Sequence, residues 1–191
     1  MGNLVLLAHI SLDGFVANAK GELSDFDASD ENLAFVCELT KSANAALFGR
    51  ISYKLLDEYW PKAKDREDAT SAEISFSNWY NKATKIVISK TLFPKKNDDT
   101  VVISTDISNE IIKLKEQNSK DILIFGSPSI SQLMMRADLI DSYWIFINPV
   151  IFGKGIPLFL DQPNKLKLKL IATKQFTNGE FALNYVAENR F

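Results

Sequence analysis

The sequence predicts an α/β protein with a mostly parallel central sheet, helices on both faces of the sheet and a C-terminal antiparallel hairpin. Nearly continuous apolar runs, such as residues 4–10 and 122–125, are typical of strands that are buried on both faces. Segments with helical spacing alternate with these runs, which favours parallel strands joined by crossover helices. Asn178-Gly179 lies between two alternating segments and favours a tight hairpin turn, because both residues tolerate positive φ.

The N-terminal part begins with a strand over residues 4–10. Residues 11–30 are rich in Gly, Asp, Asn and Ser, so we expect a long loop there. A helix follows, with Ser29 or Asp30 as its cap. A short apolar run at residues 45–48 then predicts a buried strand.

The middle of the chain continues with a short helix, which the break at Trp60-Pro61 is expected to end. Another helix is predicted over residues 72–82, with Ile74 on its buried side. Apolar triplets inside residues 85–89 and at residues 101–103 predict two more strands.

The last third starts with a helix for which Asp106 is the expected cap. The strand at residues 122–125 ends at a glycine, and a helix with one apolar stripe follows it. A long apolar strand is predicted over residues 143–152. In residues 166–170 leucines alternate with lysines, so we expect a strand with one buried and one wet face.

Length and composition fit one domain over residues 1–191, since roughly 100–200 residues per domain is usual. The net charge is −2 and no long basic run occurs, which argues against nucleic-acid binding. The single cysteine, Cys37, excludes an internal disulfide, and together with the single histidine, His9, it falls short of a usual zinc site. We therefore expect no metal. The absence of a signal-peptide pattern and of a membrane-length apolar run predicts a cytoplasmic protein with no membrane partner.

The end of the second buried strand carries Gly49-Arg50-Ile51-Ser52. Gly49 permits close backbone approach to a ligand, the helix N-terminus that follows favours an anion, and the Arg50 guanidinium suits phosphate oxygens. Ser52 adds a hydroxyl. From these residues alone an ordinary turn, with Arg50 paired to a surface carboxylate, is the simpler interpretation.

Two other strand ends carry similar residues. Gly126-Ser127-Pro128-Ser129 stands between a strand and a helix, where free backbone N–H groups suit a pyrophosphate. An ordinary turn with Pro at the first helical position explains it equally well, and it is neither GxGxxG nor a P-loop. Ser89-Lys90 ends another strand, where Lys90 is either a phosphate ligand or a solvated lysine.

The loop after the first strand holds the carboxylates that could donate a proton, and their spacing does not select one: Asp13, Glu22, Asp25, Asp27 and Asp30. His9 shares a strand face with Ser11, as a Ser-His-Asp site would need. Because nothing marks a nucleophile elbow, we interpret His9 as a histidine at a strand end.

Taken together, several segments resemble one family in the same order along the chain. His9–Ala17 (HISLDGFVA) resembles the SLDGxxA opening of the reductase domain of bifunctional riboflavin-biosynthesis deaminase-reductases. It is also similar to their stand-alone bacterial relatives, known as dihydrofolate-reductase-like proteins. The other matching segments are Phe48–Tyr53, Tyr59–Pro61, Lys85–Leu92, Ile124–Ser127, Leu139–Asp141, Pro149–Gly155 and Pro157–Phe159.

The resemblance implies a dihydrofolate-reductase-like fold with NADPH as cofactor. It assigns the adenosine 2′-phosphate to Arg50, Ser52, Ser89 and Lys90, and the pyrophosphate to Gly126, Ser127 and Ser129, with Gly49 in the neighbouring turn. It places Asp13 and Gly14 near the nicotinamide. The helix acid of dihydrofolate reductases has no clear counterpart here, and Asp30 and Glu31 at the helix start are the candidates for it, so Asp13 and Asp30 are the catalytic candidates. The relatives are commonly homodimers, and residues 143–152 are expected to contribute to the contact.

The implied function is NADPH-dependent reduction of a small heterocyclic substrate. The ring is that of 5-amino-6-(5-phosphoribosylamino)uracil, as in riboflavin biosynthesis, or a pterin, as in dihydrofolate reductase. Gly49-Arg50 stands where the riboflavin reductases carry an acidic pair, which argues against the first ring. The lack of a Pro-Trp element with its helix acid argues against a true dihydrofolate reductase. A non-catalytic NADP(H)-binding module is the alternative.

Overall fold

A computed structural model describes residues 1–26, 29–93, 100–160 and 165–188. Within these ranges one sheet of eight strands has the order β5-β4-β3-β6-β1-β7-β10-β9. Its strands are β1 (Leu4–Ser11), β3 (Ala43–Gly49), β4 (Thr84–Ile88), β5 (Val101–Ile103), β6 (Asp121–Phe125), β7 (Ser142–Asn148), β9 (Leu168–Gln175) and β10 (Phe181–Ala187). All pairs from β5 to β7 are parallel, and β10 is antiparallel to both β7 and β9. The predicted parallel sheet and C-terminal hairpin are confirmed.

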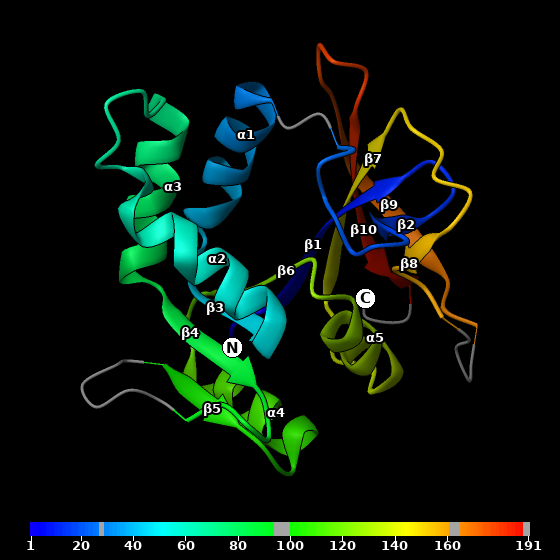
Figure 1. Cartoon of the computed structure of the whole chain (residues 1–191). Helices are drawn as coiled ribbons and strands as arrows, with labels where there is room; N and C mark the ends of the chain where they lie inside the picture. The colour runs from blue at the N-terminus through cyan, green and yellow to red at the C-terminus, as the bar shows by residue number, and fades with distance from the viewer. Residues whose placement is uncertain (27–28, 94–99, 161–164, 189–191) are drawn as a thin grey trace.

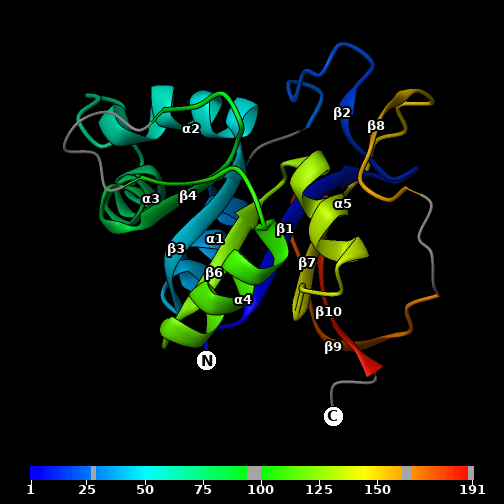
Figure 2. The ribbon, with the colours of Figure 1, turned by 90° about the horizontal axis from the view of Figure 1, so that it is seen from below.

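Helices cover both faces of this sheet (Figures 1 and 2). On one face lie α1 (Asp30–Thr40), α2 (Arg50–Ala63) and α3 (Ser71–Lys82), and on the other α4 (Ile107–Gln117) and α5 (Pro128–Arg136). Successive residues of β1 point to opposite faces, so Leu4 and Leu6 join the layer under α4 and α5, while Val5 and Leu7 join the other layer. Burial on both faces explains why the first five residues of β1 are all apolar.

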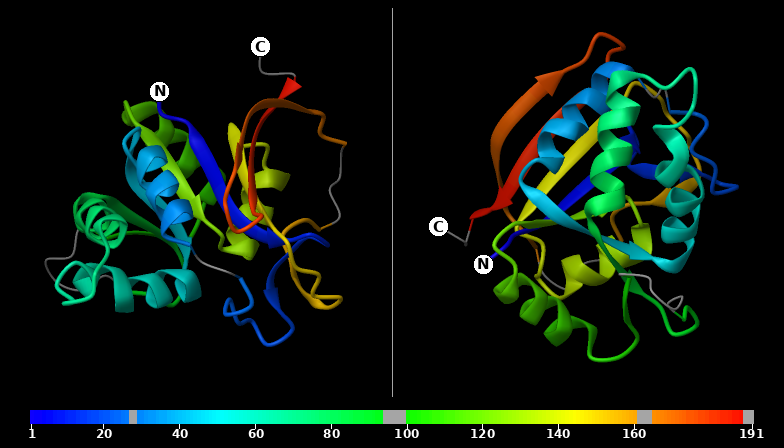
Figure 3. Two further views of the ribbon diagram at one scale, coloured as in Figure 1. Left: turned by 90° about the horizontal axis from the view of Figure 1, so that it is seen from above. Right: turned by 90° about the vertical axis from the view of Figure 1, so that its left-hand side faces the viewer.

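The predicted loop over residues 11–30 was partly wrong. It contains β2 (Phe15–Asn18), which pairs antiparallel with β8 (Gly155–Pro157) outside the main sheet (Figure 3). A Cβ atom on Gly155 would lie 2.3 Å from the carbonyl oxygen of Ala17, so only glycine allows this pairing. A strand this short, with a partner this distant in the chain, leaves no local periodicity to detect.

The predicted break at Trp60-Pro61 was also wrong, because α2 continues through Pro61 to Ala63. Proline removes one backbone donor near the end of the helix, and side chains of α3 bind the carbonyl oxygens there. Ser77 donates to the Trp60 oxygen at 2.7 Å and Asn81 to the Pro61 oxygen at 3.1 Å. The proline therefore costs the helix little stability at this position.

Other expectations needed correction at the level of single residues. Ile74 is 40% exposed, whereas Tyr80, which the sequence also placed on the buried side, is buried together with Ala72 and Phe76. Asp106 occupies the N-cap position of α4 but its side chain makes no cap. The strand predicted over 143–152 ends at Asn148. In β9 the leucine side was expected to be buried, yet Leu170 is 47% exposed at the sheet edge.

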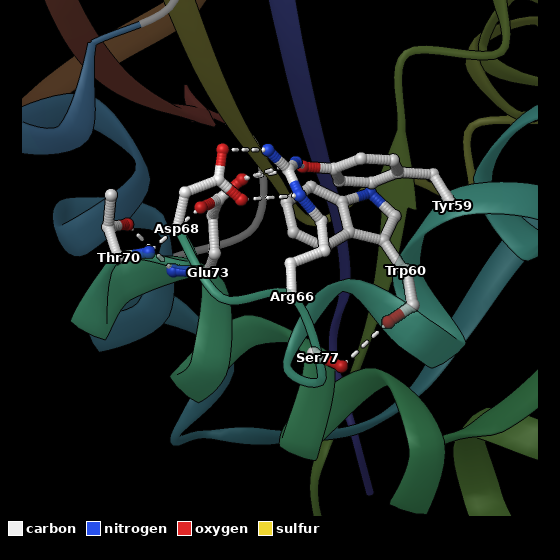
Figure 4. A network of polar contacts seen from close by, with 7 residues as sticks. All are labelled: Tyr59, Trp60, Arg66, Asp68, Thr70, Glu73 and Ser77. Atoms are coloured by element: carbon white, nitrogen blue, oxygen red, sulfur yellow. Dashed lines mark hydrogen bonds and ion pairs between the residues drawn. The ribbon is translucent and has the colours of Figure 1, made fainter.

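The connection between α2 and α3 is held by a polar network (Figure 4). The Tyr59 hydroxyl donates to Glu73 at 2.5 Å, and Arg66 reaches both the Tyr59 hydroxyl and Asp68. Glu73 and Thr70 form a reciprocal capping box at the start of α3. The hydrogen bond to Glu73 raises the pKa of Tyr59 and lowers that of Glu73. These side chains are satisfied locally, so the network has a structural role.

A buried ion pair joins α4 to the beginning of the sheet. Lys115, whose side chain is 5% exposed, lies 2.6 Å from Asp141 and donates to the Leu139 oxygen at 3.1 Å. The same Asp141 oxygen accepts the Leu4 backbone N–H at 2.7 Å. This pair fixes the amino end of β1 against α4 and the turn before β7.

We expect Lys115→Met to lower the free energy of unfolding by about 3–5 kcal/mol, since it leaves a carboxylate without its buried partner. Chemical denaturation measures the loss. Lys113→Met is the matched control, because Lys113 pairs with Glu110 on the exposed side of the same helix and such pairs contribute about 0–1 kcal/mol. Equal, small effects in the two variants would contradict the structural role of Lys115.

The expected homodimer and the contribution expected of residues 143–152 to its contact both stay predictions. β7 lies inside the sheet between β1 and β10, so it offers no free edge. Sedimentation equilibrium of the purified chain should give the mass of two chains, and a monomeric mass at tens of micromolar would contradict the homodimer.

Candidate functional site

The carboxyl ends of the parallel strands bring the predicted ligand residues to one edge of the sheet. Gly49 at the end of β3 pairs in register with Ile88 of β4, so Arg50 and Ser89 follow from neighbouring strand ends. On its other side β3 pairs with β6, with Leu47 opposite Ile124, so the Gly126 turn emerges next to Gly49. Lys90, Arg50 and Gly126 therefore lie along one edge, in the strand order β4, β3 and β6.

This edge contains a topological switch point. After β3 the chain passes through α2 and α3 to β4, on one side of β3, while after β6 it passes through α5 to β7, on the opposite side of β6. α2 and α5 also lie on opposite faces of the sheet. In open α/β sheets such a point opens a crevice outside the carboxyl ends of the strands, where ligands bind.

A hydrogen bond ties the two turns at this crevice. The Gly49 backbone N–H donates to the Ser127 hydroxyl oxygen at 2.9 Å. A Cβ atom at position 49 would lie 3.0 Å from that oxygen and 3.1 Å from Ile130 Cγ1, so any side chain would push these two side chains away and glycine favours the close approach. Ser127 is buried and has φ of 40°, a region that L-residues adopt rarely. The Ser127 hydroxyl oxygen therefore accepts a hydrogen bond from within the protein, whereas the family resemblance implied that Ser127 binds the pyrophosphate directly.

The two helices that begin at this edge, α2 and α5, lack the features that usually stabilise a helix start. α1 and α3 each have a side-chain cap and an acidic residue in the first turn, whereas α2 and α5 have neither. Arg50 even places a positive charge at the first position of α2, where the helix dipole disfavours it. Arg50 is exposed and has no partner in the described part of the chain. An anion beside Arg50 would resolve this conflict.

The remaining predicted phosphate ligands divide into two groups. Lys90, Ser52 and Ser129 have no side-chain partner within the described ranges, and Lys90 and Ser129 are exposed. Ser89 is buried, and its hydroxyl oxygen accepts the backbone N–H groups of Thr91 and Leu92 at 3.1 and 3.0 Å. Ser89 therefore shapes the turn that presents Lys90.

Asp13 braces two loops at the end of β1. Its carboxylate accepts the Ser11 hydroxyl at 2.6 Å and the backbone N–H groups of Phe152 and Gly153 at 3.1 and 2.8 Å. The Ser11 hydrogen bond, supported by these amides, lowers the pKa of Asp13. These contacts favour a structural role for the Asp13 carboxylate, and the catalytic role expected of Asp13 stays a prediction. Gly14, with φ of 88°, turns the chain beside it.

The other loop carboxylates lie apart from a common centre. Asp30 is exposed at the first position of α1, and Glu31 accepts the Thr177 backbone N–H at 2.9 Å, which, with the Thr177 hydroxyl and Lys174, lowers the pKa of Glu31. Glu22 and Asp25 both bind the Asn18 side chain. Asp27 lies outside the described residues.

Sequence reasoning missed a polar cluster that involves His9. His9 Nδ1 lies 2.8 Å from Glu180 Oε1, and Asn32 donates to Glu180 Oε2 at 2.8 Å. The Glu180 side chain is only 1% exposed and that of His9 is 38% exposed. Because Asn32 and Glu180 are 148 positions apart, nothing in the sequence marks them as neighbours.

An open hollow of about 530 Å³ lies next to the Asp13 brace, lined by Asn18, Ala19, Lys20, Phe152, Gly153 and Lys154. The search of the described residues finds no group of three or more His, Cys, Asp or Glu side chains that could hold a metal ion. Nor does that part of the chain contain a helix with the length and apolarity needed to cross a membrane.

Comparison with known proteins agrees with this architecture. The Bacillus subtilis (strain 168) protein YyaP is 29% identical over 182 residues, covering 95% of this chain and 93% of YyaP. A putative riboflavin biosynthesis protein from Shewanella sp. PV-4 has a similar structure, with a TM-score of 0.73, 22% identity and coverage of 98% and 99% of the two chains. Dihydrofolate reductase from Enterococcus faecalis, complexed with NADP(H), gives a TM-score of 0.64 at 13% identity, with 98% and 97% coverage.

A bifunctional protein shows where this fold occurs in a longer chain. The deaminase and 5-amino-6-(5-phosphoribosylamino)uracil reductase from Thermotoga maritima matches with a TM-score of 0.67 and 18% identity, over 97% of this chain and 56% of the Thermotoga chain. These likenesses establish the dihydrofolate-reductase-like fold. The model of the RibD C-terminal domain family matches residues 3–181, and the chain belongs to that family of reductase-like domains.

Proposed function

We propose that this protein is an NADPH-dependent reductase of a small pyrimidine- or pterin-like ring. One observation carries the proposal: the cations Arg50 and Lys90, which have no side-chain partner among the described residues, stand at adjacent strand ends, beside the open Gly126 turn at a topological switch point. Membership of a reductase-like family supports the reaction class. The names of two structural relatives, a uracil reductase and a dihydrofolate reductase with NADP(H), support the cofactor and the kind of ring.

The residues at the crevice fit a phosphorylated dinucleotide. Arg50, Lys90 and Ser52 would hold the 2′-phosphate, because fixed cations and hydroxyls bind phosphate oxygens strongly. The uncapped starts of α2 and α5, with Gly126 and Ser129, would hold the pyrophosphate. From β4 to β1 the edge spans roughly 14 Å at about 4.8 Å per strand, which gives room for an extended cofactor that ends near Gly14. When bound, the nicotinamide would supply a hydride.

The alternative is a module that binds NADP(H) without turnover. The hydrogen bonds that hold Asp13 to two loops and the exposure of Asp30 favour this alternative, because neither carboxylate is placed as a buried proton donor. Nucleotide fluorescence separates the possibilities: a change on adding NADPH shows binding, and loss of NADPH absorbance with dihydrofolate or the ribosylaminopyrimidine phosphate shows turnover. Binding without turnover across such a panel would favour the module, and no binding would exclude both.

We expect Arg50→Ala to weaken NADPH binding about 10- to 100-fold, because hydrogen bonds to charged groups contribute about 1.5–3 kcal/mol and about 1.4 kcal/mol is tenfold. Binding of NADH, which lacks the 2′-phosphate, should change little. Fluorescence titration with both nucleotides measures the ratio. Lys62→Ala, at the far end of the same helix, is the control and should leave both affinities unchanged. Equal affinity of the unaltered protein for NADPH and NADH would contradict the assignment.

Gly126→Ala tests the proposed pyrophosphate turn. A Cβ atom at Gly126 would meet nothing within 4 Å, although φ is +56°, so the variant should fold with a loss of about 1–2 kcal/mol. The methyl group would enter the space that the pyrophosphate needs, and NADPH binding should fall more than tenfold. Gly21→Ala carries the same kind of strain at φ +82°, away from the crevice, and should bind normally. Normal NADPH affinity in Gly126→Ala would remove this turn from the site.

A further inference from the structure

The His9 cluster is a polar group that the cofactor crevice does not use. His9 lies two residues before the end of β1, roughly 7 Å from Ser11 along the strand, and pairs in register with Phe146 of β7. Its side chain is on the face that α1 covers, where it stacks on Phe146 with ring centroids 4.6 Å apart. His9 is thus close to the carboxyl edge where the nicotinamide would end, on the α1 side of the sheet.

Three separate elements build the cluster. β1 supplies His9, the first turn of α1 supplies Asn32, and Glu180 comes from the end of the β9–β10 turn. Glu180 is almost fully buried, and its Oε1 atom has no partner in the described residues other than His9. A buried carboxylate without a proton or a cation beside it is costly, so this position favours a proton on His9 Nδ1.

Fixing Nδ1 determines what the other ring nitrogen can do. With Nδ1–H directed to Glu180, Nε2 is an acceptor in the neutral ring and a donor in the imidazolium. Nε2 has no partner in the described part of the chain, and the side chain is 38% exposed. A carboxylate that orients a histidine in this way is the general arrangement of acid–base pairs in enzymes.

The surroundings suit a flat ring. Phe26 tilts against His9 at 6.4 Å between centroids and against Phe152 at 5.2 Å. Apolar walls with few polar groups are typical of sites for small heterocycles. Besides Glu180, the elements around His9 carry charged groups on α1 and β9, and Glu31 and Lys174 pair with each other at 3.2 Å. These charged residues are Asp30, Glu31 and Glu38 of α1 and Lys169 and Lys174 of β9.

We propose that His9 is the catalytic residue that binds the substrate ring through Nε2 and gives it a proton, and that Glu180 is its positioning residue. This inference rests on the proposed reductase function. In the step, the hydride of a reduced nicotinamide dinucleotide, which is oxidised, forms a C–H bond at the carbon of a ring C=N bond, whose π bond breaks. The nitrogen uses the released electron pair to form an N–H bond with the proton, while the Nε2–H bond of the imidazolium breaks and its electrons stay on Nε2. The neutral imidazole regains its proton from solvent.

Contact can be tested without cofactor or turnover, because the chain has only one histidine. In protein without a tag, a single imidazole Cε1–H signal reports on His9 by NMR. Titration with dihydrofolate or 5-aminouracil should shift this signal with the same midpoint as the binding measured by calorimetry. Binding that leaves the His9 signal unmoved, or no binding of either probe, would overturn the proposal whether or not the protein binds NADPH.

Kinetics test the proton step. His9→Gln should lower kcat about 100-fold or more, the usual range for general acid catalysis, with KM changed less than about threefold. Thr177→Ala is the matched control, since it removes a hydrogen bond between the hairpin and α1 at Glu31 without touching His9, and should keep normal kinetics. A kcat of His9→Gln close to that of the unaltered protein would overturn the proposal.

Glu180→Gln tests the positioning role through a spectroscopic signature. Asn32 Nδ2 requires an acceptor, so it should retain the glutamine oxygen and turn the glutamine NH₂ group toward His9. The ring should then move its proton from Nδ1 to Nε2, which ¹⁵N NMR of the imidazole detects, and kcat should fall at least tenfold. An unchanged tautomer with unchanged kcat would overturn the role of Glu180. Failure of the reductase proposal would be a separate result: the unaltered protein would neither bind nor consume NADPH.

Discussion

The close approach of the β3–α2 turn to the β6–α5 turn is the constraint on which the site depends. Gly49 gives its backbone N–H to Ser127 at 2.9 Å, and a side chain at position 49 would press on Ser127 and Ile130. Because the chain leaves these two strands in opposite directions, the turns meet at a switch point where two helices begin. Every ligand role considered for Arg50, Lys90 and Gly126 follows from this approach.

Several departures from local preference meet where β3 and β6 end. Arg50 begins a helix where an acidic residue would be more stable, Ser127 adopts a left-handed conformation, and two helices start without side-chain caps. Left-handed residues also occur elsewhere, at Asp106 and Asp138, and α4 begins without a side-chain cap as well. The combination of an exposed cation with two uncapped helix starts, rather than strain alone, is the reason to place function at these turns.

The crevice and the His9 cluster divide the carboxyl edge into two parts with different chemistry. The part at β4, β3 and β6 offers cations and backbone N–H groups, which suit phosphates. The part at β1 and α1 offers a histidine, a buried carboxylate and aromatic rings, which suit a flat polar ring. Asp13 stands between them and holds the β1–β2 turn to Phe152 and Gly153, so its role is to maintain the shape of the edge.

The sequence by itself determined the α/β class, the parallel sheet with its terminal hairpin and the strand ends that carry Arg50, Lys90 and Gly126. These features rest on periodicity, turn residues and motif order, all of which are local. Only the tertiary structure decided that Asp13 is a brace, that Ser127 ties two turns, and that His9 meets Glu180 and Asn32. The reason is physical: these roles depend on contacts between residues far apart in the chain, and the environment that sets whether a carboxylate is exposed, buried or ionised exists only in the folded protein.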